Sequence, residues 1–156
     1  MSWCGLSTVE SGFIYSIYSV AGLTTPLWGA LSDRMSRRYV FSALCWLSSF
    51  SVLAFVVATS HALRCFTAFL VGSAVGGFAV YAAMVGDYYD KALYGTAFGL
   101  LTLFLGIGMT LGPALGGYVI ATSKSMGNAI LLSALGYGLA GILAIIVGRR
   151  RSAPRL

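Results

Sequence analysis

The stretch GALSDRMSRRYV, residues 29–40, places one Asp and three Arg within six positions, and long apolar runs lie on both sides of it. Charged side chains avoid the hydrocarbon core of a membrane, so a charged island of this kind marks the end of one apolar segment and the start of the next. These residues have two interpretations: a polar turn between two helices, or a functional element.

The composition indicates that the chain lies in a lipid bilayer. Of its 156 residues, 58% are hydrophobic and only 9% are charged, whereas soluble domains carry about 25% charged residues. A chain of this size cannot hide so much apolar surface in one core surrounded by water. The net charge of +6 does not predict nucleic-acid binding, because the basic residues form no face with interleaved aromatic side chains.

Five apolar segments are long enough to cross a bilayer, whose core of about 30 Å requires about 20 helical residues. Because lipid offers no hydrogen-bond partners to the backbone, continuous apolar segments must be helical. We predict an all-α polytopic helical bundle that forms a single membrane domain over residues 1–156, with a cytoplasmic tail at 148–156. The predicted spans are 11–32, 39–60, 63–86, 94–121 and 127–147.

The basic residues predict the orientation of the bundle. One set of helix ends carries eight Lys or Arg residues, and the other set carries only Arg64 and Lys124. By the positive-inside rule the first set is cytoplasmic, which places the N-terminus outside and the C-terminus inside, in a plasma or inner membrane. The eight residues are Arg34, Arg37, Arg38, Lys91, Arg149, Arg150, Arg151 and Arg155.

Glycine content distinguishes the spans. The second span contains no Gly, the first contains three, the third contains four including Gly86 at its end, and the fourth contains seven. Small residues allow helices to approach closely, whereas contact with lipid makes no such demand. We therefore expect the first, third and fourth spans to pack centrally, the second to lie nearer the lipid, and the fifth to be intermediate.

The fourth span has glycine on two faces. At about 100° per residue, its seven glycines fall into two stripes on nearly opposite sides, which predicts a helix held between two neighbours. Pro113 removes the backbone hydrogen bond to the Met109 carbonyl and is expected to bend the helix. The stripes are Gly95, Gly99, Gly106 and Gly117 on one side and Gly108, Gly112 and Gly116 on the other.

Two motifs resemble those of the major facilitator superfamily. GALSDRMSRR, residues 29–38, is similar to the loop signature between the second and third helices of each six-helix half. GMTLGPALGG, residues 108–117, is similar to the Gly-Pro-Gly-Gly pattern of the fifth helix. The order and spacing of the motifs imply five helices of one half. The sequence looks most like the C-terminal half of monocarboxylate-transporter-like or oxalate/formate-antiporter-like members, which implies a fragment containing helices eight to twelve.

The resemblance implies a role for each motif. The charged loop would tie the cytoplasmic helix ends together in one conformation and release them in another; its residues are Gly29, Asp33, Arg34, Arg37 and Arg38. The second motif would pack helices; its residues are Gly108, Gly112, Pro113, Gly116 and Gly117. The sequence departs from the family pattern in two places, since Ser36 replaces a usual Gly and Thr25 stands where monocarboxylate carriers often have Arg.

One face of the first span is a candidate lining for a substrate cavity. Tyr15, Tyr18 and Thr25 recur at helical steps with glycines, and they would either line a cavity or pack helices. The interiors of the spans hold no Asp, Glu, Lys, Arg or His, so no proton relay or metal site is indicated. We expect no cofactor and no enzymatic activity, because the single His61 has no recognisable nucleophile or carboxylate partner.

These observations predict part of a secondary active transporter that moves a small organic solute by alternating access. Five helices would form one wall of its cavity. We therefore expect the partners to be the lipid bilayer, the solute, and the missing other half of the transporter or a partner subunit. Two alternatives remain open: helices two to six of an N-terminal half, and a non-transporting membrane protein that assembles with a partner through its small-residue faces.

Overall fold

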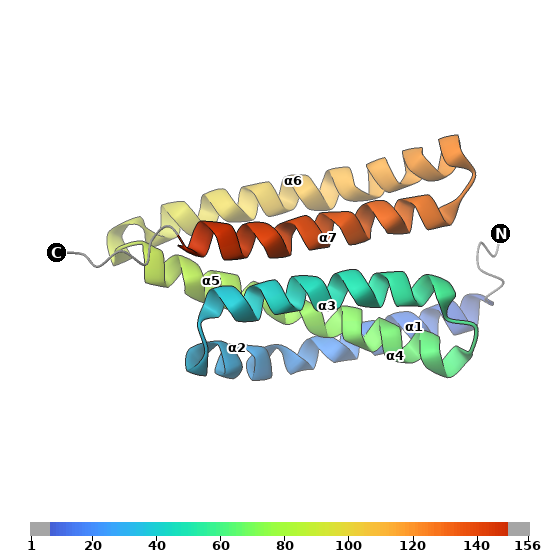
Figure 1. Cartoon of the computed structure of the whole chain (residues 1–156), viewed down its shortest axis with the longest axis horizontal. Helices are drawn as coiled ribbons and strands as arrows, with labels where there is room; N and C mark the ends of the chain where they lie inside the picture. Colours follow the sequence, from blue (N-terminus) through green and yellow to red (C-terminus); the bar gives the residue numbers. More distant parts are fainter. Residues whose placement is uncertain (1–6, 150–156) are drawn as a thin grey trace.

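The computed structural model describes residues 7–149, and within that range every element is a helix. Residues 150–156 of the predicted tail lie outside the described residues. The elements, coloured along the chain in Figure 1, are α1 (Thr8–Ala21), η1 (Gly22–Thr24), α2 (Thr25–Arg34), α3 (Arg37–Val57), α4 (His61–Ser73), η2 (Ala74–Gly76), α5 (Gly77–Tyr88), α6 (Lys91–Ser123) and α7 (Met126–Arg149).

Four stretches of the described residues are long and apolar enough to cross a membrane, and they correspond to the second to fifth predicted spans. The first predicted span is the continuous helical run α1–η1–α2. This run is not among the four, because its many Ser, Thr and Tyr hydroxyls lower its hydropathy. The predicted all-α polytopic bundle is confirmed. The four stretches are Arg37–Val57, His61–Tyr88, Lys91–Ser123 and Met126–Ile146.

The first and third spans both change to a tighter 3₁₀ turn near their middle. In the first span the reason is Pro26, which has no backbone N–H to donate to the Gly22 carbonyl. That carbonyl instead accepts hydrogen bonds from the backbone N–H of Thr25 and from its hydroxyl, the latter at 2.6 Å. In the third span the turn falls on Ala74–Gly76. The two 3₁₀ turns contact each other, so the spans cross where both are irregular.

Helix α3 is the centre of the bundle, contrary to the expectation that the second span lies nearer the lipid. It contacts α4, α5 and α7, and it contributes Val40 and Leu44 to the buried core around Val80. Helix α6, by contrast, has no buried residue and packs only along parts of α5 and α7. Figure 1 shows it along the outer edge of the bundle. The prediction of a central fourth span is therefore wrong for this chain by itself.

Serine hydroxyls hold α3 to α7. Ser42 donates a hydrogen bond to the Gly141 carbonyl at 2.9 Å, and Ser49 donates one to the Ala134 carbonyl at 2.8 Å. Both hydroxyls are buried, and in an apolar environment a pairing of this kind contributes about 0.6 kcal/mol. The small residue Gly141 also lets the ring of Trp46 approach the helix backbone. Small and polar residues, not glycine number alone, therefore determine the main helix contact.

The helix ends divide into two groups. The α2–α3 turn, the α5–α6 turn and the end of α7 lie at one end of the bundle, which we call the Arg37 end (Figure 1). The start of α1, the α3–α4 turn and the α6–α7 turn lie at the other, which we call the Arg64 end. The described members of the basic set assigned from the sequence to one membrane face therefore share the Arg37 end; they are Arg34, Arg37, Arg38, Lys91 and Arg149.

Candidate functional site

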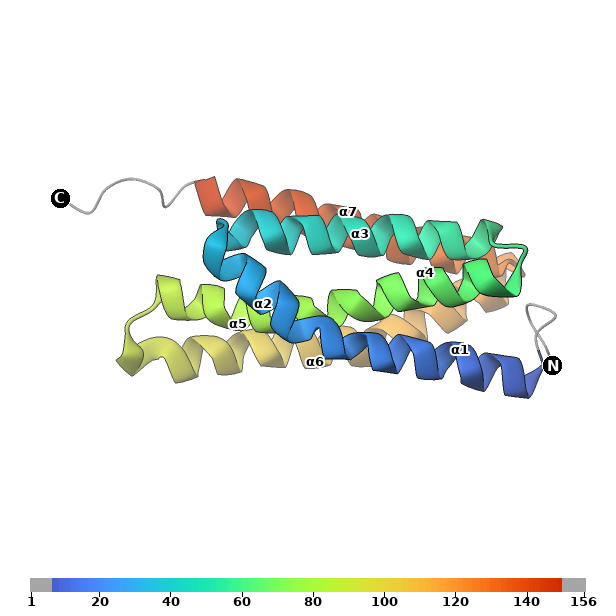
Figure 2. The same ribbon diagram turned by 90° about the horizontal axis from the view of Figure 1, so that it is seen from below.

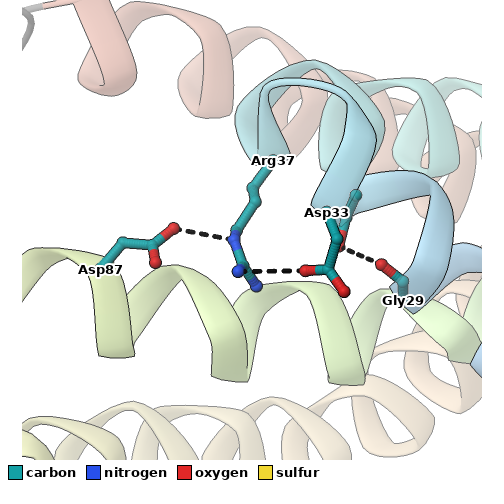
Figure 3. A network of polar contacts seen from close by, with 5 residues as sticks. Gly29, Asp33, Arg37 and Asp87 are labelled. Carbon is teal, nitrogen blue, oxygen red and sulfur yellow. Dashed lines mark hydrogen bonds and ion pairs between the residues drawn. The ribbon is translucent and has the colours of Figure 1, made fainter.

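The charged loop forms an ion-pair cluster that joins three helices. Arg37, the first residue of α3, places its Nη2 atom 3.1 Å from Oδ1 of Asp33 in α2. Its Nε atom lies 2.8 Å from Oδ2 of Asp87 in α5. Figure 3 shows the guanidinium between the two carboxylates. One cation therefore connects the ends of the first, second and third spans.

The other two arginines of the loop behave differently. The guanidinium of Arg38 lies over the ring of Tyr39, 4.8 Å from its centroid. Arg34 is exposed at the last turn of α2, where a positive charge is favoured by the helix dipole. Among the described residues the ion pair of Asp33 is with Arg37.

A cavity of about 260 Å³ lies beside this cluster, between the α2–α3 turn and α5. Its lining includes Asp33, Arg37 and Asp87. The backbone behind it is held by the Ser32 hydroxyl, which donates to the Gly29 carbonyl at 2.7 Å (Figure 3). A Cβ atom added at Gly29 would meet no atom of a neighbouring helix within 4 Å among the described residues. The signature glycine therefore leaves space that residues 7–149 do not fill.

Asp87 is the member of the cluster that the motif did not reveal. It lies in GDYYDK, residues 86–91, which follows the third span. This segment supplies two acidic residues to an end of the bundle that is otherwise basic. Both the charged loop and this segment end on the same predicted face of the membrane. Charge complementarity at that face was the available signal, since acids placed there would be attracted to the arginine-rich loop.

The crossing of the first and third spans is very close. A methyl group at Gly72 would collide with the backbone carbonyl oxygen of Tyr18, and one at Gly76 would lie 2.5 Å from Cδ1 of Trp28. These two glycines are four residues apart, the spacing that lets helix backbones touch in membranes. The Gly-rich sequence of the third span was correctly interpreted as a packing surface.

The predicted cavity-lining residues lie on the first span but are not enclosed by the described chain. Tyr15 is 68% exposed, and its ring stacks on that of Tyr18 at 5.9 Å. The Thr25 hydroxyl is used within its own helix, where it donates to Gly22. These side chains would line a cavity only if another part of a transporter faced α1 and α2.

A larger apolar groove separates α6 from the rest of the bundle. It has a volume of about 690 Å³ and is lined by residues of α3, α5, α6 and α7, including Phe41, Leu101 and Ala140. The Tyr81 hydroxyl in its wall is buried and has no hydrogen-bond partner in the described part of the chain. We call this space the α5–α6 groove.

The second motif lies along α6, which continues unbroken through Pro113. Among the described residues, a Cβ atom added at any of its four glycines would meet no atom of a neighbouring helix within 4 Å. The motif thus has free space beside each glycine, and its packing role stays a prediction. The four glycines are Gly108, Gly112, Gly116 and Gly117.

Comparison with known families identifies the chain. The sequence profile of the Major Facilitator Superfamily matches residues 4–156, nearly the whole chain. This chain belongs to the major facilitator superfamily. Members of this superfamily are membrane transporters and not enzymes, and the apolar helices agree with a multi-pass membrane protein.

A relative from Arabidopsis thaliana, described as a "Probable peptide/nitrate transporter", is similar to this superfamily member. The two are 28% identical over 123 residues, which is 76% of this chain and 25% of the relative. The chain therefore spans about a quarter of the length of the relative that it matches. No solved structure matches the sequence significantly.

Proposed function

We propose that this chain is one part of a secondary active transporter that moves a small organic solute by alternating access. On this proposal its five helical runs are helices eight to twelve of twelve, in the C-terminal half. The observation that best supports this proposal is the cluster of Asp33, Arg37 and Asp87, which joins three spans at one end of the bundle. Such a cluster is suited to hold that end in one conformation and release it in another.

The ion pairs of this cluster are weak enough to break and re-form during a conformational change. The side chains are only partly covered, with Arg37 27%, Asp33 65% and Asp87 53% exposed. Ion pairs with this exposure contribute about 0–1 kcal/mol each. Two of them together bias a conformational equilibrium by an amount that a bound solute can overcome.

The exposure of α6 supports the proposal that the transporter has a second part. The glycines on both faces of α6 have room for an added Cβ atom, the α5–α6 groove is an open apolar space of about 690 Å³, and Tyr15 on α1 is 68% exposed. We propose that the rest of the transporter covers α1, α2 and α6, and that Tyr15, Tyr18 and Thr25 then face the solute. The length of the Arabidopsis relative, about four times the matched segment, agrees with such a missing part.

The orientation and the solute are parts of the same proposal. We place the Arg37 end in the cytoplasm, because most Lys and Arg residues lie there. The printed name of the relative mentions peptide and nitrate. The interiors of the spans offer no cation to bind an anion, so we propose an uncharged or zwitterionic solute, such as a short peptide, for contacts made by this part.

Sequencing the complete transcript tests the proposed position in the transporter. We expect seven further apolar spans, in frame, before residue 1. One upstream span followed by six downstream would instead indicate helices two to six of an N-terminal half. A transcript that encodes residues 1–156 alone would contradict the transporter proposal and favour a non-transporting membrane protein, whose exposed α6 would bind a partner.

A further inference from the structure

A small cavity at the Arg64 end of the bundle combines a cation with apolar walls. It has a volume of about 210 Å³ and lies where the end of α3, the start of α4 and the start of α7 meet. Its lining is Arg64 together with Phe55, Val56, Ala58, Met126, Gly127 and Ile130. The cavity is far from the Arg37 cluster, at the opposite end of the bundle.

The guanidinium of Arg64 is held in place but not neutralised. Its Nε atom donates to the Ala58 carbonyl oxygen at 3.0 Å, which fixes the side chain across the α3–α4 turn. Its two terminal nitrogens make no ion pair or hydrogen bond within residues 7–149. Glu10 is within electrostatic influence of Arg64, but its carboxylate accepts the Ser7 backbone N–H at 2.8 Å. The cation therefore keeps its two terminal nitrogens, which carry four N–H donors, for a ligand.

The position of the cavity restricts the ligand. The helices that form it are membrane-spanning, and the cavity lies at their ends, where a bilayer places its head groups. Guanidinium groups bind phosphate oxygens through paired hydrogen bonds. The side chains of Phe55, Val56 and Ile130 provide an apolar surface next to the cation. A ligand with a phosphate and an attached hydrocarbon chain would satisfy both.

We propose that this cavity binds a phosphate-bearing anion through Arg64, and that the apolar walls favour a phospholipid over free phosphate. The guanidinium donates to the phosphate, and the upper part of an acyl chain lies along Phe55, Val56 and Ile130. The inference does not depend on the transport function, because it concerns a surface at the other end of the bundle from the Arg37 cluster.

The test measures lipid retention by the full chain. The purified protein in detergent is incubated with phosphatidylglycerol, and bound lipid is counted by native mass spectrometry. We expect Arg64→Gln to weaken binding about tenfold, since it removes a charge-assisted pair of hydrogen bonds. Lys124→Gln removes an equal charge from an exposed position at the same end of the bundle and should change binding by less than about twofold.

A second pair of variants leaves Arg64 and its bond to Ala58 intact. Ile130→Glu places a carboxylate in the cavity and should also weaken lipid binding about tenfold. The carboxylate would pair with the Arg64 guanidinium and repel the phosphate of the lipid. Leu131→Glu makes the same change on the neighbouring, 52% exposed residue outside the cavity and should have little effect. Circular dichroism of each variant reports whether its helices are intact.

Inorganic phosphate distinguishes the two sources of the anion. For a lipid site, sodium phosphate should displace the lipid no better than sodium chloride at equal ionic strength. If phosphate displaces the lipid specifically and itself raises the melting temperature, the site takes free phosphate and the lipid assignment is overturned. Equal lipid loss in Arg64→Gln and Lys124→Gln, or in Ile130→Glu and Leu131→Glu, would overturn the site as a whole.

Discussion

Arg37 is the residue on which the Arg37 end of the bundle depends, because it pairs with Asp33 and Asp87 at once. Replacing it with Gln leaves two carboxylates facing each other without a cation. We expect Arg37→Gln to lower the free energy of unfolding in mixed detergent micelles by about 1 kcal/mol. Arg34→Gln removes the same charge from an exposed position and should cost less than about 0.5 kcal/mol. Equal effects of the two changes would exclude a specific role for Arg37.

The positions of the two acidic residues of this cluster were not equally predictable from the sequence. Asp33 and Arg37 are four residues apart across a short turn, and the motif placed them together. Asp87 lies fifty positions beyond Arg37, and its proximity depends on how α5 packs against α2 and α3. No local pattern encodes that packing. Only the charge balance at this end of the bundle hinted at it.

Glu10 provides a pH-dependent contact at the other end of the bundle. Hydrogen bonds from the backbone and side chain of Ser7 hold the pKa of the Glu10 carboxyl below its ordinary value of 4.5. A lowered folded pKa means that the ionised form stabilises the start of α1 above about pH 4.5. This stabilisation is lost as the pH falls through the folded pKa.

Hydrogen exchange of the first turn of α1, measured against pH, checks the role of Glu10. We expect exchange to become faster, after correction for the intrinsic rate, as the pH falls below 4.5. Glu10→Gln can still accept a hydrogen bond from Ser7 but cannot titrate. This variant should show no such pH dependence, and a dependence equal to that of the wild type would assign the effect to another group.

The crossing of the first and third spans is the element-scale feature most sensitive to added volume. Gly72→Ala places a methyl group against the Tyr18 carbonyl, which belongs to a backbone and cannot rotate away. We expect a loss of about 1–3 kcal/mol in the free energy of unfolding. Gly99→Ala on α6 meets no neighbouring atom and should be neutral or slightly stabilising in this chain, since Ala favours helix. Similar losses at both positions would contradict the close crossing.

The helices themselves could be predicted, but their neighbours could not. Long apolar runs between charged turns gave each span to within a few residues, and Pro26 explains the break in the first. Glycine number suggested a central fourth span, yet α6 has no buried residue. Glycine indicates that a helix has a surface suited to close contact, not which helix will meet it. The glycine-free α3 is central because its serines and Trp46 fit against α7.

At the scale of the whole molecule, the bundle is asymmetric. The α1–η1–α2 and α4–η2–α5 runs cross tightly and pack on α3 (Figure 2), whereas the glycines of α6 have room for an added Cβ atom among the described residues. In a membrane such a surface contacts lipid at no great cost, so the chain can fold with α6 facing lipid. The proposed transporter becomes complete only when that surface is covered.

Solute uptake into sealed proteoliposomes tests most directly whether this chain is one part of a larger transporter. The vesicles contain residues 1–156 as the sole protein, and radiolabelled dipeptide and nitrate are offered in the presence and absence of a proton gradient. Uptake should not exceed that of protein-free vesicles for either solute, because five helical runs supply one wall of a cavity. Saturable, protein-dependent uptake by this chain alone would contradict the account.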